Sequence, residues 1–160
     1  MGMRVRRVVT GHDPHGRAIV KADNILENIA ERRPGVQSCV VWSTATSPAD
    51  NSDEEDRANH PVGITMRGGT VFRIITYQPG ITPRRHRTLS VDYAIVLSGA
   101  IDMELDDTVV HLSAGDVLVQ RGTVHSWVNR GPDPCTIAFV LVDAKPVVIA
   151  DKTLGAEAAF

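Results

Sequence analysis

Short runs of apolar residues, many of them β-branched and several alternating with polar positions, recur through the second half of the chain. Residues that favour turns separate these runs, among them Gly99, Gly115 and the Gly131-Pro132 pair. We therefore expect strands at residues 70–77, 93–97, 101–105, 108–112, 117–120, 125–129 and 136–142. Many short strands without helical patterns between them predict an all-β protein, an antiparallel double-sheet jelly-roll barrel.

The pattern before these strands is less regular. Three further β-rich runs predict an N-terminal hairpin and one more strand, at residues 4–10, 17–21 and 36–43. Asn24 and Glu27 have the spacing of a helix capping box, and Pro34 and Gly35 would end such a helix. We expect at most this one short helix beside the strands.

A long polar stretch, residues 44–63, is acidic and rich in turn-forming residues, so it predicts a surface loop. At 160 residues the chain is long enough for one domain with its own core. Within that domain we expect residues 1–66 to pack on the barrel or on a dimer partner. The barrel itself is expected at 67–145 and a tail at 146–160.

Composition favours a cytoplasmic protein that binds small molecules. The formal net charge is −2, so there is no electrostatic bias toward nucleic acid or an acidic membrane surface. No apolar run approaches the length that spans a bilayer, and no pair of DNA-binding helices is indicated. Cys39 and Cys135 stand far apart without metal-ligand spacing, as is typical of core cysteines in a reducing compartment.

Polar chemistry is concentrated in one stretch, residues 80–129. Side chains alternate between the two faces of a strand, so His125, Trp127 and Asn129 are expected to share one face. His86 and Thr88 share a face for the same reason.

This stretch resembles the first motif of the cupin superfamily, in which a glycine, an H-x-H pair, a glutamate and a second glycine follow at fixed spacing. Gly80, His86, Asp92 and Gly99 stand at the corresponding places, with Thr88 in place of the second histidine and aspartate in place of glutamate.

The second cupin motif runs from a glycine through a proline-glycine turn to a histidine and an asparagine. Gly115, His125 and Asn129 match it, whereas residues 120–123 stand where the turn should be. The whole chain is similar to small single-domain bacterial "cupin 2" proteins. The resemblance implies the barrel fold with its motif side chains pointing inward, so His86, Asp92 and His125 are expected to converge in the barrel mouth.

Two chemistries are open for these three residues. Two histidines and one carboxylate can bind a divalent transition metal (Fe, Mn, Zn or Ni) and support an oxygenase or a lyase. Against this, Thr88 replaces an imidazole ligand and Asp92 is about 1.5 Å shorter than glutamate.

The rival chemistry needs no metal. His86 or His125 then acts as a general base, because a free imidazole titrates near pH 6.5. Asp92 orients the ring, and Tyr93 or Arg121 polarises an oxygen of the substrate. This arrangement suits a dehydratase, an isomerase or a decarboxylase.

Other residues are expected around the substrate, namely Thr88, Trp127, Arg87 and Asn129. Arg87 would bind a carboxylate through a bidentate pair if its side chain turned inward. The alternative from a different class is a barrel that serves only as a metabolite-binding or sensor module without catalysis.

The strand at 93–97 is apolar on both faces, because Tyr93, Ile95 and Leu97 lie opposite Asp92 and the face that carries Asp92 is apolar too. Such a strand needs a covering partner on each side. The N-terminal hairpin can supply it, from the same chain or from a second subunit as in many cupins. We therefore expect a homodimer.

Overall fold

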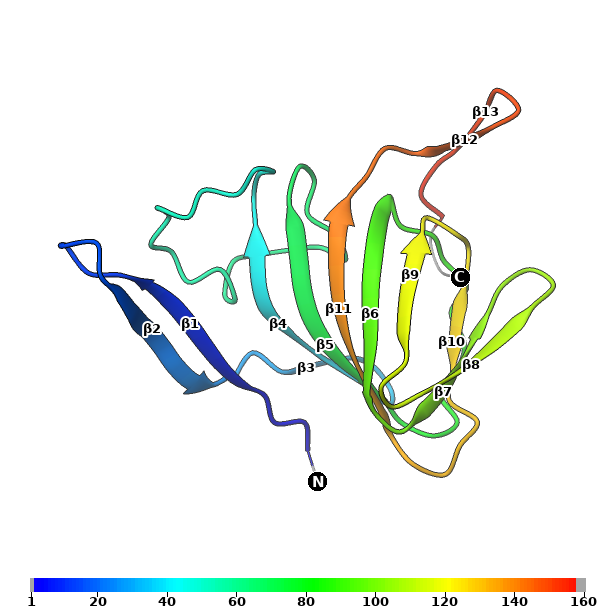
Figure 1. Ribbon diagram of the computed structural model, residues 1–160. Coiled ribbons are helices and arrows are strands. Elements are labelled where there is room, and N and C mark those ends of the chain that lie inside the picture. Colours follow the sequence, from blue (N-terminus) through cyan, green and yellow to red (C-terminus); the bar gives the residue numbers. More distant parts are fainter. Residues whose placement is uncertain (1, 158–160) are drawn as a thin grey trace.

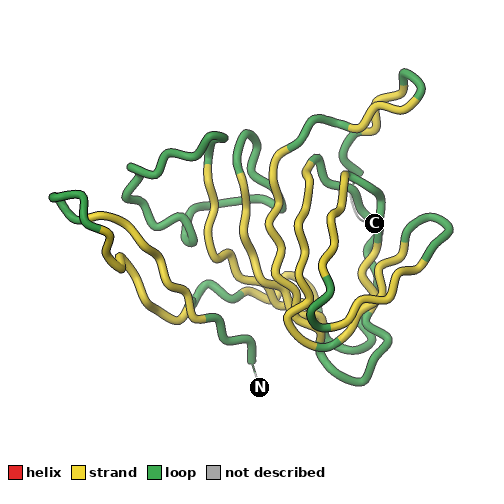
Figure 2. Tube along the Cα trace, in the orientation of Figure 1, coloured by secondary structure: helices red, strands yellow, loops and turns green. Residues whose placement is uncertain are grey.

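A computed structural model describes residues 2–157 of the chain as strands, turns and loops, without a helix in that range (Figures 1 and 2). The first half contains β1 (Arg6–His12), β2 (Ala18–Ile25), β3 (Ala30–Arg33), β4 (Val36–Thr44) and β5 (Thr70–Tyr77). The second half contains β6 (Ser90–Ser98), β7 (Ala100–Glu104), β8 (Val109–Ser113), β9 (Val117–Arg121), β10 (Ser126–Val128), β11 (Cys135–Asp143), β12 (Val147–Ile149) and β13 (Lys152–Leu154). The predicted all-β class is confirmed.

Two antiparallel sheets form the barrel. The larger has the strand order β3-β4-β5-β11-β6-β9, and the smaller has the order β10-β7-β8 (Figure 1). Neighbours in the larger sheet are far apart in sequence, because β11 pairs with both β5 and β6. This order is the crossed connectivity of a jelly roll rather than of a simple meander. It brings the beginning of β6 and the end of β9 side by side at one end of the barrel.

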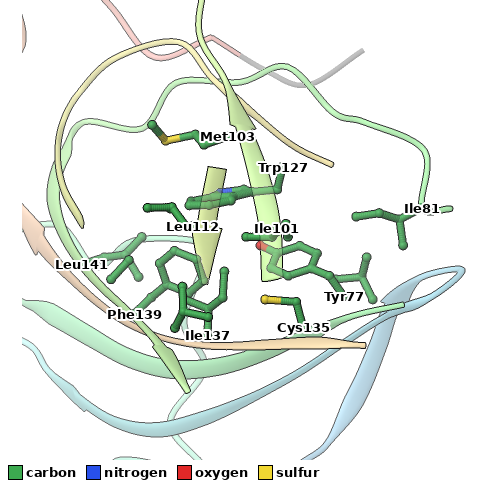
Figure 3. Packing of buried hydrophobic residues seen from close by; sticks show 13 residues of the cluster. Tyr77, Ile81, Ile101, Met103, Leu112, Trp127, Cys135, Ile137, Phe139 and Leu141 are labelled. Carbon is green, nitrogen blue, oxygen red and sulfur yellow. The ribbon is translucent and has the colours of Figure 1, made fainter. Parts of the chain in front are cut away.

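The core lies between these two sheets (Figure 3). Trp127 is at its centre, with ring centroids 5.6 Å from Phe139 and 6.3 Å from Tyr77. Ile101, Ile137 and other aliphatic side chains fill the remaining space. Burial of each large apolar side chain stabilises the fold by about 1.5–3 kcal/mol, so this cluster is the main source of stability.

The prediction of a short helix between Asn24 and Pro34 is wrong, because β2 and β3 occupy much of this segment. Asn24 lies in β2, where it pairs with Arg7 of β1. Its side-chain oxygen accepts hydrogen bonds from Arg7 Nε and Nη2 at 3.3 and 3.2 Å, so it caps no helix. Residues 30–33 then pair with β4. A capping box is a local signal, and here the strand ladders outweigh it.

The predicted N-terminal hairpin is confirmed as β1 and β2, which in Figure 1 extends away from the main sheet beyond β4. The predicted polar loop is also free of strands from residue 45 to residue 69. Ion pairs hold it in place, since Arg7 donates to Asp56 at 2.6 and 2.8 Å and Lys21 donates to Glu54 at 2.7 Å. The expected tail forms the small hairpin β12–β13.

The outer face of the main sheet is only partly covered. A second apolar cluster, which includes Val5 and Leu26, packs on the β4–β5 side. On the β6 side, Tyr93, Ile95 and Leu97 remain 46–50% exposed. The hairpin of the same chain therefore does not cover this strand. Residues 2–157 contain no helix able to cross a membrane.

Candidate functional site

A group of buried polar side chains interrupts the apolar interior at one end of the barrel. Asp92 is on β6, Gln120 is on β9, and His125 directly precedes β10. Inward positions on β6 alternate with outward ones, which places Ser90 and Asp92 on the inner face. Asp92 faces Gln120 across the β6–β9 ladder, so the two side chains meet.

Hydrogen bonds join this group into a chain. Ser90 Oγ donates to Asp92 Oδ1 at 2.5 Å and lies 2.9 Å from the Thr88 hydroxyl. On the other side, Gln120 Nε2 donates to Asp92 Oδ2 at 3.1 Å and lies 3.2 Å from His125 Nε2. The Gln120 amide therefore bridges the carboxyl group and the imidazole.

The second nitrogen of His125 determines its tautomer. Nδ1 lies 3.0 Å from the Thr123 carbonyl oxygen and must carry the proton to donate to it, so Nε2 accepts the proton of Gln120. Burial lowers the pKa of His125 to about 4, and the neutral form is the one that fits these two bonds. Burial also raises the pKa of the Asp92 carboxyl group.

His86 lies at the more open side of the group. Its backbone N–H and C=O pair with those of His125 at 3.0 Å each, and the two ring centroids are 4.3 Å apart. His86 Nδ1 lies 3.1 Å from the Arg84 carbonyl oxygen and donates to it. This tautomer leaves His86 Nε2 as a basic nitrogen without a hydrogen-bond partner among the described residues.

These residues do not fit the metal centre that the cupin resemblance suggested. In residues 2–157 no three side chains of His, Cys, Asp or Glu are grouped closely enough to hold an ion. The reason is visible in the geometry, because the amide of Gln120 stands between Asp92 and His125. The nitrogen of His125 that would bind a metal faces an N–H donor instead.

Two of the predicted catalytic residues lie elsewhere, which corrects their assignment. Tyr93 and Arg121 are exposed on the outer face of the sheet. Each is a direct chain neighbour of an inward residue, Asp92 and Gln120, so alternation turns it outward. Neither is in a position to polarise a substrate oxygen beside the histidines.

The four predicted pocket residues have different places. Thr88 belongs to the hydrogen-bonded chain described above. Trp127 is a core residue whose edge contacts His125, with 5.9 Å between ring centroids. Asn129 is buried and structural, because its Nδ2 donates to the carbonyl oxygens of Tyr77 and Asp133 at 3.0 and 2.9 Å. Arg87 turns to the outer rim, where its Nη1 donates to the Gly155 carbonyl oxygen at 3.3 Å.

Sequence reasoning missed Gln120 and Ser90. A signal for Gln120 was present, since it is a polar residue at an inward position of an apolar strand. Its Oε1 is buried without a hydrogen-bond partner among the described residues, which is unusual for a buried polar atom. Ser90 gave no such signal, because serine is common at strand ends.

The barrel of two antiparallel sheets, with the motif histidines at one end, has the architecture expected of a cupin. Comparison with known proteins agrees with this class. The family model "Cupin domain" matches residues 73–142. "Cupin-domain-containing oxidoreductase fogC" of Aspergillus ruber is 33% identical over 161 residues, covering 94% of this chain and 78% of the relative. The chain belongs to the cupin family.

The chain is also similar to a further relative and, in fold, to a solved structure. "Phomopsin biosynthesis cluster protein C'" of Diaporthe leptostromiformis is 36% identical over 160 residues, which cover 93% of this chain and 84% of the relative. Both of these relatives are fungal and give no support to the bacterial origin that the resemblance suggested. An uncharacterised conserved protein with a double-stranded β-helix domain from Klebsiella pneumoniae has a similar fold. It matches with a TM-score of 0.53 and 20% identity over 84% of this chain and 92% of that one.

Proposed function

We propose that this protein is a cupin enzyme that moves a proton on a small molecule, with His86 as the general acid or base and without a bound metal. The observation that carries the proposal is the pair of adjacent, tilted histidine rings with centroids 4.3 Å apart. His86 is half-buried, and His125 is held in a buried hydrogen-bond network. Relatives named as cupin-domain-containing oxidoreductases support an enzyme in general.

The two histidines have different roles in this proposal. His86 Nε2 accepts a proton from the substrate or returns it, because Nδ1 is already engaged with a carbonyl oxygen. His125 stays neutral, since its pKa is about 4 and both of its nitrogens are hydrogen-bonded. The His125 ring is held by Gln120 and Asp92 and packs beside His86, so it fixes the position of the His86 side chain. A dehydratase, an isomerase or a decarboxylase would use this arrangement.

The test compares wild-type protein with His86→Gln and with the control His15→Gln, an exposed histidine in the β1–β2 turn. Each protein is incubated in D2O with a fractionated metabolite mixture, and mass spectrometry follows product formation and deuterium incorporation. We expect turnover to fall by about 10²–10⁴-fold in His86→Gln, the usual contribution of a general acid or base. Unchanged turnover in that variant would refute the proposal, and binding without any product would favour the non-catalytic module.

A separate measurement tests the absence of a metal. Elemental analysis of untagged protein, before and after dialysis against a chelator, is expected to show no stoichiometric transition metal. Thermal unfolding is expected to be the same before and after dialysis. A stoichiometric ion that is lost in His86→Gln would instead support the metal-assisted oxygenase or lyase.

We also propose that two copies associate through the uncovered outer face. Tyr93, Ile95 and Leu97 of β6 continue into Val117 and Val119 of β9, and all five are about half exposed or more. A contiguous apolar patch of this kind is typical of an interface.

A single charge tests this association. Ile95→Glu is expected to shift a dimer to a monomer in light scattering at micromolar concentration. Val148→Glu, an exposed apolar position on β12, is the control and is expected to leave the dimer intact. A wild-type protein that is already a monomer would contradict the proposal.

A further inference from the structure

A small cleft lies on the barrel rim, outside the histidine pair. It has a volume of about 150 Å³ and is formed by the beginning of β6, the end of β9 and the segment that leads into β12. In Figure 1 the β12–β13 hairpin extends from this same end of the barrel. Val147 of that hairpin lines one wall, and Gly122 faces it so closely that an added Cβ would lie 3.4 Å from the valine side chain.

The cleft is positively charged. Arg87, Arg121 and Lys145 all line it, and no aspartate or glutamate is among its lining residues. Arg121 and Lys145 form no ion pair with any residue in the described range. Three cations around a space this small repel one another unless an anion lies between them.

Arg87 is the most enclosed of the three. Its side chain is only 15% exposed, and its Nε is buried without a hydrogen-bond partner in residues 2–157. One carboxylate is near it, but Glu157 Oε2 is 3.9 Å from Nη1, at the limit of an ion pair. The guanidinium of Arg87 is therefore incompletely hydrogen-bonded and only weakly paired with a carboxylate.

We propose that this rim cleft binds the carboxylate or phosphate of an acidic substrate. Guanidinium groups favour such anions because their N–H donors match paired oxygens. The cleft is also connected with the polar centre, since the Thr88 and Ser90 that line it are hydrogen-bonded to each other and Ser90 donates to Asp92. An anion held here therefore fixes one end of a molecule on the segment that carries His86.

That the anion belongs to a substrate rests on the proposed function, whereas anion binding in the cleft does not depend on it. The proposal gives Arg121 a role that differs from the one predicted from sequence. Its side chain points outward, away from the histidines, and lines the cleft.

The test measures anion binding directly, with inorganic phosphate and acetate as separate probes. Amide chemical shifts of the wild-type protein are followed during titration, with sodium chloride at matched ionic strength as reference. The test variant is Arg121→Gln/Lys145→Gln, whose positions are exposed. The control is Arg4→Gln/Arg67→Gln, which removes two exposed positive charges elsewhere.

We expect saturable shifts at Gly122 and its neighbours, and binding at least about tenfold weaker in the test variant only, because that variant loses two cationic hydrogen-bond donors. The stronger probe identifies the anion as carboxylate or phosphate. No saturable binding to the wild-type protein, or equal loss in the control, would overturn the proposal.

Turnover of His86→Gln separates this inference from the proposed function. If His86→Gln loses turnover and still binds the anion, both stand. If it loses turnover while the wild-type protein binds no anion, only the rim cleft fails. If anion binding is found and His86→Gln retains full turnover, the proposed function fails and the cleft remains an anion site.

Discussion

His125 is expected to make the protein less stable as the pH falls below neutrality. Burial lowers the pKa of its imidazole from about 6.5 to about 4. Below pH 6.5 the unfolded chain binds a proton at this position and the folded protein does not. The contribution of His125 to stability is therefore fully present above pH 6.5 and is lost as the pH falls toward 4. The perturbation that isolates it is His125→Gln, which removes the titrating group.

The size of the effect follows from the two pKa values. Between pH 7 and pH 5 the free energy of unfolding should fall by about 2 kcal/mol through His125 alone, and by pH 4 the loss should reach about 3 kcal/mol. Asp92 acts in the opposite direction, since its pKa is raised by burial and the folded protein takes up its proton first. Asp92 is present in both proteins, so the difference between wild type and His125→Gln isolates the histidine.

Urea unfolding at pH 7, 6 and 5 measures this difference. His15→Gln is the control and is expected to follow the wild type, because that side chain is exposed in a turn. The wild type should lose about 2 kcal/mol more than His125→Gln over this range. A parallel fall in both proteins would refute the conclusion that His125 is buried and neutral.

Two further substitutions, each with a control, test the hydrogen bonds of Gln120 and the close backbone contact at Gly99. Gln120→Leu leaves the buried Asp92 Oδ2 and His125 Nε2 without a hydrogen-bond donor, and it is expected to lower the free energy of unfolding by about 2 kcal/mol. Gln78→Leu is the control, and equal effects in urea unfolding would count against the bridge. Gly99→Ala is expected to cost at least about 2 kcal/mol, since φ is 73° and the added methyl would lie 2.4 Å from a backbone carbonyl oxygen. Gly80→Ala, with φ of 71° and open space, should cost only about 1 kcal/mol, and an equal cost would show that the close contact is unimportant.

The strands of the barrel could be predicted because alternation and turn residues are local signals that the fold obeys. On β6, for example, the buried Ala94 and Val96 alternate with the exposed Tyr93 and Ile95, as the two-residue period requires. The capping pattern at Asn24 is local as well, but it was wrong. Ladder pairing of β2 with β1 is a contact between distant residues, and a short sequence window does not contain it.

The candidate site was predictable in position but not in chemistry. The motif spacing predicted that His86 and His125 lie together, and the structure places their ring centroids 4.3 Å apart in a tilted arrangement. What the sequence did not reveal is which atom lies between Asp92 and His125. That depends on the β6–β9 register, which sets Gln120 opposite Asp92. The register depends on how the two strands pair in space, so it cannot be predicted from the sequence of either strand alone.

Gln120 occupies the place between Asp92 and His125 that a shared metal ion would need. A bound cation would satisfy the lone pairs of Asp92 and His125, and here the two protons of one amide do so. The amide also fixes the His125 tautomer, because its N–H requires a bare Nε2. Both nitrogens of that ring are then occupied, so the basic nitrogen left at the barrel mouth is Nε2 of His86. The Gln120 amide that separates Asp92 from His125 thus also distinguishes the two histidines chemically.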